Sequence, residues 1–121
     1  MEVLPVNLFE DSFKPMLELL NESSIEYQMR AKRSGVVMNA SEVIEIIANA
    51  SIWVSLASVI IAFIKAKNSR EVIITTKDNK IIHAKGLDSK QLEVVLQNAQ
   101  NISAIDTGKE QNITNGSKTT R

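Results

Sequence analysis

The central segment of this chain constrains its fold most. Residues 41–67 have the length and composition of one long helix, and the core of that helix, Ile52 to Ile64, is apolar on every side. A helix without a polar face must be buried in its own domain, in a partner or in a membrane. We therefore predict a long central helix from Ser41 to Lys67 against which the other elements pack. The whole run would be about 40 Å at 1.5 Å per residue, which is long for so small a domain, so the helix could kink or break near Asn49 to Ser51.

Length and composition predict one domain with a tail. A chain of 121 residues is enough for one hydrophobic core. Its last part, TGKEQNITNGSKTTR, is rich in Thr, Asn, Gly and Lys and contains one isolated apolar residue, Ile113. Such a segment cannot bury enough apolar surface to order itself. We expect a single α/β domain over residues 1–106 and a flexible polar tail over residues 107–121.

Charge and composition exclude several classes of function. The 14 basic residues balance the 14 acidic ones, so the chain has no overall field that would attract nucleic acid or anionic lipid. The absence of cysteine excludes disulfides and thiolate sites, and a single histidine, His83, excludes a histidine-rich metal cluster. No cofactor is expected. The segment MEVLPVNLFED has acids where a secretory signal has basic residues, which favours a cytoplasmic location.

Two shorter amphipathic helices flank the central segment. The first follows a cap at Asp11 or Ser12 and ends near Asn21, and the second begins at the capping-box pair Asp88 and Gln91. Apolar residues recur at helical spacing in both. These residues are Phe13, Met16, Leu17 and Leu20 in the first helix, and Leu92, Val95, Leu96 and Ala99 in the second.

The clearest strand signal is a β-hairpin, in which Val72 to Thr76 and Lys80 to Ala84 flank a turn at Asp78 and Asn79. With these two residues as the loop, Ile74 faces His83. The other expected strands are Val3 to Val6, an edge strand interrupted by Pro5, then Ile25 to Met29 and Ile102 to Ile105. The elements together predict an α+β fold, with a small, mainly antiparallel sheet packed on the long central apolar helix and the two shorter helices.

A stripe of small residues is a candidate helix-packing interface. It consists of Ala48, Ser51, Ser55, Ser58 and Ala62, which recur at spacings of three and four residues along the expected central helix. Small side chains let another backbone approach closely. A helix that is apolar all round also has one more face than a small monomer easily covers, so a self-associating form would use this stripe. The same face could instead meet the N-terminal helix of the same chain.

Two clusters of basic residues form a candidate basic patch. They are Arg30, Lys32 and Arg33, then Lys65, Lys67 and Arg70. If the fold brings both clusters to one end, they could contact the phosphates of a nucleic acid. The few aromatic residues lie at core-like positions rather than at exposed ones, which favours a solvated basic edge over nucleic-acid binding.

A membrane-spanning alternative rests on the same central segment. Ile46 to Ile64 is 19 residues long, roughly 28 Å at 1.5 Å per residue, and basic residues follow it. This alternative is a single-pass protein of the inner membrane with a cytosolic hairpin domain. Asn49 and three serines within the segment count against it, and without this helix the remaining elements have almost no core. Burial in the domain is therefore favoured.

The remaining polar residues have structural explanations. His83 lies in mid-strand without a matched carboxylate motif, so we interpret it as a sheet-face histidine rather than a general base. Glu42 and Glu45 suit the start of a helix, and Asp78 and Asn79 are turn residues. No nucleophile, base and orienting group can be assembled at a recognisable spacing, so an enzyme is not expected.

The stretch from Ser55 to Leu96 resembles the effector-associated constant components, a family of small bacterial proteins. The resemblance covers a small-residue helix, a basic turn, a strand, the Asp78–Asn79 turn, a second strand and a helix with an acidic cap. It implies a non-enzymatic accessory of a bacterial or phage conflict system, of the immunity type or effector-associated, which binds a partner protein such as a toxin or effector. It implies no catalytic residues.

Overall fold

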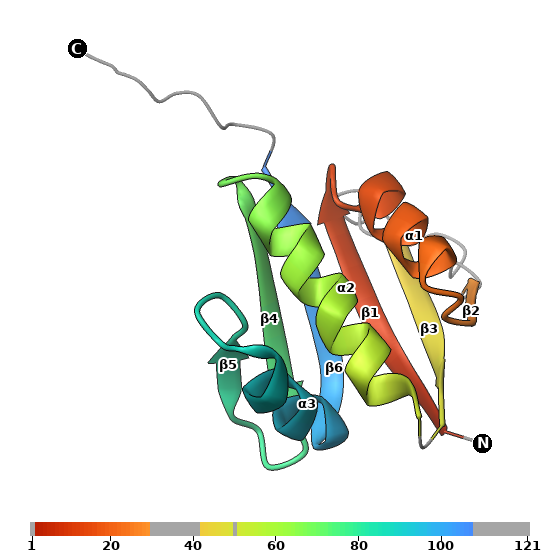
Figure 1. The fold of residues 1–121 in the computed structure, drawn as a ribbon, viewed down its shortest axis with the longest axis vertical. Coiled ribbons are helices and arrows are strands. Elements are labelled where there is room, and N and C mark those ends of the chain that lie inside the picture. Colours follow the sequence, from red (N-terminus) through yellow and green to blue (C-terminus); the bar gives the residue numbers. More distant parts are fainter. Residues whose placement is uncertain (1, 30–41, 50, 108–121) are drawn as a thin grey trace, which may run out of the picture.

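The computed structural model describes residues 2–29, 42–49 and 51–107, and within them the chain has an α+β fold (Figure 1). The tail expected over residues 107–121 lies, apart from Thr107, outside the described residues. The elements are β1 (Glu2–Glu10), α1 (Phe13–Glu22), β2 (Tyr27–Met29), β3 (Glu42–Ala48), α2 (Ile52–Ala66), β4 (Arg70–Thr76), β5 (Ile81–His83), α3 (Ser89–Gln97) and β6 (Ala99–Asp106).

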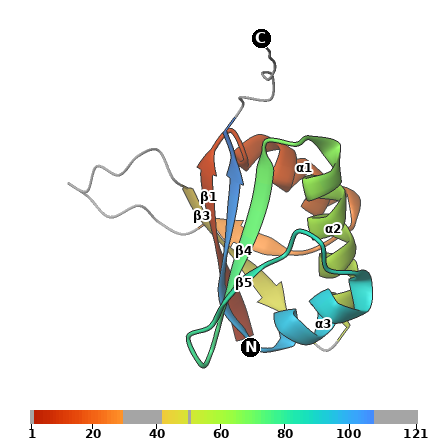
Figure 2. The same ribbon diagram turned by 90° about the vertical axis from the view of Figure 1, so that its left-hand side faces the viewer.

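The six strands form one mixed sheet in the order β2-β3-β1-β6-β4-β5. β1 and β6 are parallel, and the other neighbouring strands are antiparallel. The three described helices all lie on the same face of this sheet (Figure 2). α2 crosses the middle of that face, with α1 and α3 on either side of it (Figure 1). The sheet is thus larger than the small one expected from the sequence.

The prediction of one long central helix is wrong in its first part. Residues 42–48 form β3, and α2 begins only at Ile52. β3 pairs with β1 on one side and with β2 on the other, and its burial alternates from residue to residue. Its Val and Ile residues suit such a ladder because β-branched side chains are restricted in helices. The Asn49 side chain then accepts hydrogen bonds from the backbone N–H and hydroxyl of Ser51, which turns the chain into α2.

β1 is an interior strand, whereas the sequence predicted an edge strand. Pro5 pairs with Glu45 of β3, but the parallel ladder with β6 begins only at Val6. Since proline has no N–H to donate, it is tolerated where one ladder of a strand has not yet begun. The parallel partner, β6, includes the expected strand from Ile102 to Ile105 and extends beyond it.

The core lies between the sheet and one side of α2. The buried residues of α2 are Ile52, Leu56, Ala57, Val59, Ile60 and Phe63. They meet alternate strand residues such as Leu8, Ile44 and Ile74, which are fully buried. Full burial of side chains of this size contributes about 1.5–3 kcal/mol each. Met16 and Leu20 of α1 and Leu92 and Leu96 of α3 are buried in the same core, so packing of all three described helices on the sheet stabilises the domain.

Both shorter helices begin where the sequence predicts. Asp88 caps α3, because its carboxylate accepts from the N–H of Gln91 at 2.8 Å while the Gln91 side chain accepts from the N–H of Asp88 at 3.0 Å. Ser12 is the N-cap of α1, but its buried hydroxyl donates to the carbonyl of Ala104 in β6 at 3.0 Å instead of capping the helix. The N-cap serine thus connects the helix to the last strand.

The hairpin of β4 and β5 is confirmed, but its register differs by one residue from the expected one. Ile73 rather than Ile74 faces His83, so the loop has three residues, 77–79. Asn79 has a φ of 67°, which suits the left-handed position of a three-residue loop. The carbonyl of Lys80 accepts from the N–H of Thr76 at 2.9 Å and closes the turn.

Candidate interaction surfaces

The stripe of small residues does not form one helix face. Ala48 belongs to β3 and is buried, and Ser51 precedes α2. Ser55 is half-buried, whereas Ser58 and Ala62 are exposed. The stripe predicted on a continuous helix is divided because the chain turns between β3 and α2. Only its C-terminal part remains on the outer side of α2.

That outer side of α2 is exposed between the two flanking helices. We define the outer α2 face as Val54, Ser58, Ala62 and Lys65, which recur at spacings of three and four residues and are all exposed. The side chain of Val54 is 58% exposed. The helix is therefore not buried all round, because its last face meets neither the sheet nor α1 nor α3.

The candidate basic patch loses one member. Lys65 and Lys67 are exposed, but Arg70 is buried. The other cluster, Arg30, Lys32 and Arg33, lies outside the described residues.

Arg70 is instead the centre of a buried network at the end of α2. Its Nε donates to the Asp106 carboxylate at 2.9 Å, and its Nη1 donates to the carbonyl of Phe63 at 3.2 Å. The guanidinium also lies 4.5 Å from the centre of the Phe63 ring. Ser69 donates to the second carboxylate oxygen of Asp106 at 2.8 Å. A buried charge needs partners inside the protein, and Arg70 finds them in α2 and β6. The arginine therefore connects α2, β4 and β6 and is not presented to a ligand.

A second surface was not anticipated from the sequence: the face of the sheet opposite the helices, which we call the helix-free sheet face (Figure 2). Strand residues alternate between the two faces, so those next to the buried core residues point to this side. Its described apolar members are Val3, Pro5, Phe9, Val43, Ile47, Ile73, Ile81 and Ile105. Its described polar members are Asn7, Gln28, Glu45, Glu71, Thr75, His83, Asn101 and Ser103.

The sequence contained a signal for this face. In β1, β3 and β4, apolar residues occupy both alternating positions, as in Ile73 beside Ile74, which is typical of strands with two apolar faces. In β4, Ile74 is buried in the core, whereas Ile73 lies on the opposite face and is half-buried. The three described helices cover only one face, and none of them lies over the second apolar set.

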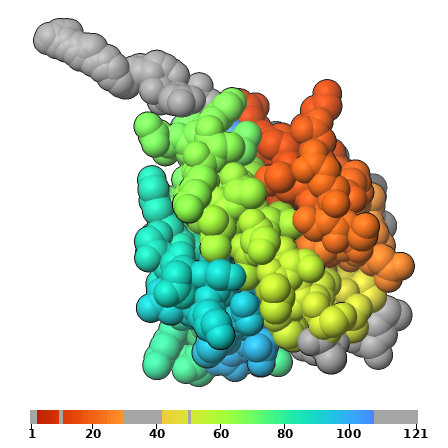
Figure 3. All heavy atoms as spheres, in the orientation of Figure 1, coloured from red at the N-terminus to blue at the C-terminus, as the bar shows by residue number. Residues whose placement is uncertain are grey.

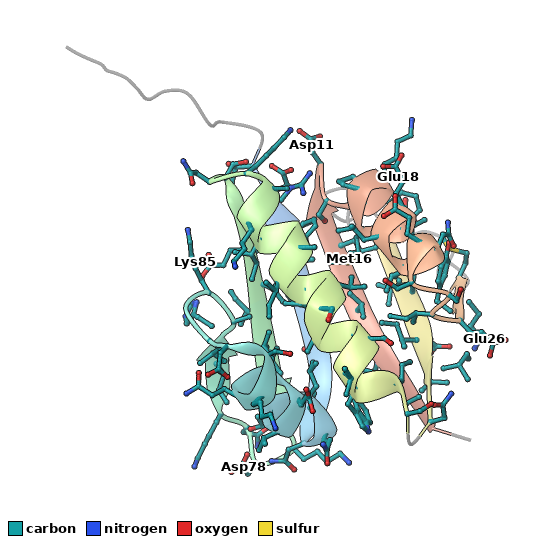
Figure 4. The ribbon with its side chains drawn as sticks, in the orientation of Figure 1. Asp11, Met16, Glu18, Glu26, Asp78 and Lys85 are labelled. Atoms are coloured by element: carbon teal, nitrogen blue, oxygen red, sulfur yellow. The ribbon has the colours of Figure 1, made fainter. Side chains whose placement is uncertain are left out.

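Polar pairs lie among these apolar residues. His83 Nδ1 is 2.5 Å from the Glu71 carboxylate, and the Gln28 amide donates to Glu45 at 2.8 Å. His83 is thus exposed on a sheet face, as the sequence indicated, and it has a carboxylate partner that sequence spacing did not reveal. At the hairpin tip, visible at the lower edge of Figure 4, the Thr76 hydroxyl donates to Asp78 and lowers the pKa of that carboxyl below its usual range.

The described residues form no cluster of three or more side chains suited to holding a metal ion. Within the same part of the chain, no helix has both the length and the apolar composition needed to cross a bilayer. The segment from Ile46 to Ile64 is divided between β3 and α2. In comparisons with known proteins, no family model, no curated protein and no solved structure matches the chain.

Proposed function

We propose that this chain is a non-enzymatic protein-binding module, an accessory component of a bacterial or phage conflict system, and that it binds its partner through the helix-free sheet face. One observation carries the proposal. Half of the described residues on this face are apolar, and none of the three described helices covers them. A surface on which apolar and polar residues alternate is typical of protein interaction sites.

The conflict-system context comes from the stretch Ser55 to Leu96, which resembles the effector-associated constant components. A helix, a basic turn, two strands joined by the Asp78–Asn79 turn and an acidic-capped helix follow one another in the order that the resemblance implies. This agreement supports a toxin or effector as the partner. The products of genes adjacent to the one encoding this chain are the first candidates.

A second candidate function is self-association through the outer α2 face. It is favoured by the exposed Val54 next to Ser58 and Ala62, whose small side chains permit close approach of a second copy. The two surfaces lie on opposite sides of the molecule, so substitutions can distinguish them.

Three matched serine substitutions provide the test. Ser103→Arg places a large cation in the middle of the helix-free sheet face, since Ser103 pairs with Asn7 and Ile73. Ser58→Arg does the same on the outer α2 face. Ser23→Arg, at the exposed end of α1, is the control. Each variant is compared with the parent by light scattering, and by co-elution with the purified products of the adjacent genes.

We expect Ser103→Arg alone to abolish co-elution. Loss of a higher oligomeric mass in Ser58→Arg alone would support self-association through α2. A parent chain that is monomeric and binds none of the neighbouring products would refute both functions. Circular dichroism establishes that each variant is folded, and Thr75→Arg on the neighbouring strand replaces Ser103→Arg if the latter does not fold.

A further inference from the structure

A pocket of about 570 Å³ lies on the helix side of the molecule, away from the helix-free sheet face. It is formed where the loop over residues 84–88, between β5 and α3, lies beside the C-terminal half of α2 (Figure 3). Its volume falls within the range of about 300–1,000 Å³ that is typical of small-molecule sites.

The wall of the pocket is apolar. Ile61 and Ile64 of α2 and Leu87 of the loop are half-buried there, and Ala84, which also lines the pocket, is buried. The loop is fixed rather than loosely placed, because the N–H of Ala84 donates to the carbonyl of Val72 at 2.9 Å and the N–H of Leu87 donates to that of Ala84 at 3.0 Å. The wall is thus preformed for an apolar ligand group.

The loop also leaves space above this wall. Gly86 has a φ of 93°, and a Cβ built on it would meet nothing within 4 Å. The glycine therefore serves the turn and does not provide a close packing contact. The space next to it is open to a ligand.

The rim of the pocket is basic. Lys65 of α2 and Lys85 of the loop both line it and are exposed. Lys85 is labelled in Figure 4. Over the described residues, neither lysine takes part in an ion pair. The single carboxylate among the lining residues is that of Asp88, the N-cap of α3, and it accepts a hydrogen bond from the N–H of Gln91. The rim therefore presents two cations beside one carboxylate that is already hydrogen-bonded.

We propose that this pocket binds a small amphiphilic anion, with an apolar body against Ile61, Ile64 and Leu87 and one anionic head group between Lys65 and Lys85. Charge complementarity at the rim selects an anion over a neutral molecule, and the apolar wall selects a hydrocarbon body over a small inorganic ion. This inference does not depend on partner binding through the helix-free sheet face, because the pocket lies on the opposite side of the sheet. With the outer α2 face it shares Lys65 alone.

The test uses sodium octanoate as the probe, with 1-octanol and sodium acetate as its neutral and short-chain counterparts. Amide NMR spectra of the full chain are recorded during titration with each compound. We expect octanoate to shift the amides of Lys85, Gly86 and Leu87 in a saturable manner. Octanol should bind about tenfold more weakly, which corresponds to two exposed ion pairs, and acetate should leave these amides unchanged.

A double variant, Lys65→Gln with Lys85→Gln, should lower the affinity for octanoate to that for octanol. Its matched control, Lys14→Gln with Lys90→Gln, removes two exposed lysines that do not line the pocket and should bind octanoate like the parent. Equal affinities for octanoate and octanol, an equal loss in the control, or no saturable shift at residues 85–87 would overturn the proposal.

Discussion

Removal of the Asp106 carboxylate should destabilise the domain more than any surface change. Asp106 accepts from Arg70 at 2.9 Å and from Ser69 at 2.8 Å, and the side chains of Arg70 and Asp106 are 8% and 2% exposed. Asp106→Ala would leave a buried guanidinium without its carboxylate. Removing one partner of a buried pair typically costs about 3–5 kcal/mol. That is a large part of the roughly 5–15 kcal/mol by which a domain is stable.

A double-mutant cycle separates this coupling from other effects. Arg70→Met keeps apolar contact with the Phe63 ring, on which the guanidinium lies at 4.5 Å, but removes the charge. Combined with Asp106→Leu, it leaves no unpaired charge, so the double variant should lose far less stability than the sum of the two single variants. Lys67→Met removes an exposed cation near the same turn and should change stability by less than about 0.5 kcal/mol.

The assay is equilibrium unfolding in urea, followed by circular dichroism and by the fluorescence of the single tryptophan, Trp53. Free energies of unfolding are extrapolated to water for the parent, Asp106→Ala, both single variants of the cycle and the double variant. A loss of less than about 1 kcal/mol in Asp106→Ala would refute the reasoning, because it would mean that water screens the pair as it does on a surface.

Three further predictions concern turns and caps. Asp88→Ala removes the acceptor of the Gln91 N–H and should cost about 1 kcal/mol in urea unfolding, whereas an unchanged midpoint would show that the cap is dispensable. Asn79→Val should lower stability by about 1–2 kcal/mol because a β-branched residue resists a φ of 67°, while Asn79→Gly should not; equal effects would contradict this. Thr76→Val should raise the pKa of Asp78 toward 3.8 in an NMR titration, since the lost hydroxyl stabilised the carboxylate. In the parent, the stabilisation linked to this depressed pKa is fully present above pH 3.8 and disappears as the pH falls through the folded-state value; an Asp78 pKa that does not change in the variant would rule out the hydroxyl as its cause.

The long-helix prediction failed at β3 because its sequence is locally ambiguous. In EVIEIIA, Glu and Ala favour a helix, while Val and Ile favour a strand, and the run precedes a true helix directly. The strand is decided by partners that are distant in sequence, namely β1, some 40 residues earlier, and β2. No local pattern contains that information.

Contacts between residues distant in sequence also explain why the candidate site residues lie in surroundings that the sequence did not predict. Arg70 has the sequence context of a basic helix end, but its burial depends on Asp106, which lies 36 residues later at the end of β6. The helix-free sheet face likewise depends on where the helices pack. In the six-stranded sheet the last strand lies beside the first, and all three described helices lie on one side of it.

Local sequence predicted both shorter helices, with starts at Asp11 or Ser12 and at Asp88, and the hairpin apart from its register. It also predicted that Ile52 to Ile64 belong to a helix, but not that one side of this helix is exposed. These features depend on caps, turns and periodicity, which act over a few residues and can therefore be recognised from a short stretch of sequence. Tertiary structure alone decided that residues 42–48 are a strand, that β1 and β6 are interior neighbours, and that the outer side of α2 is exposed. Those outcomes depend on hydrogen-bond ladders and burial between segments that are distant in sequence. The free energy of such contacts cannot be inferred from a short stretch of sequence.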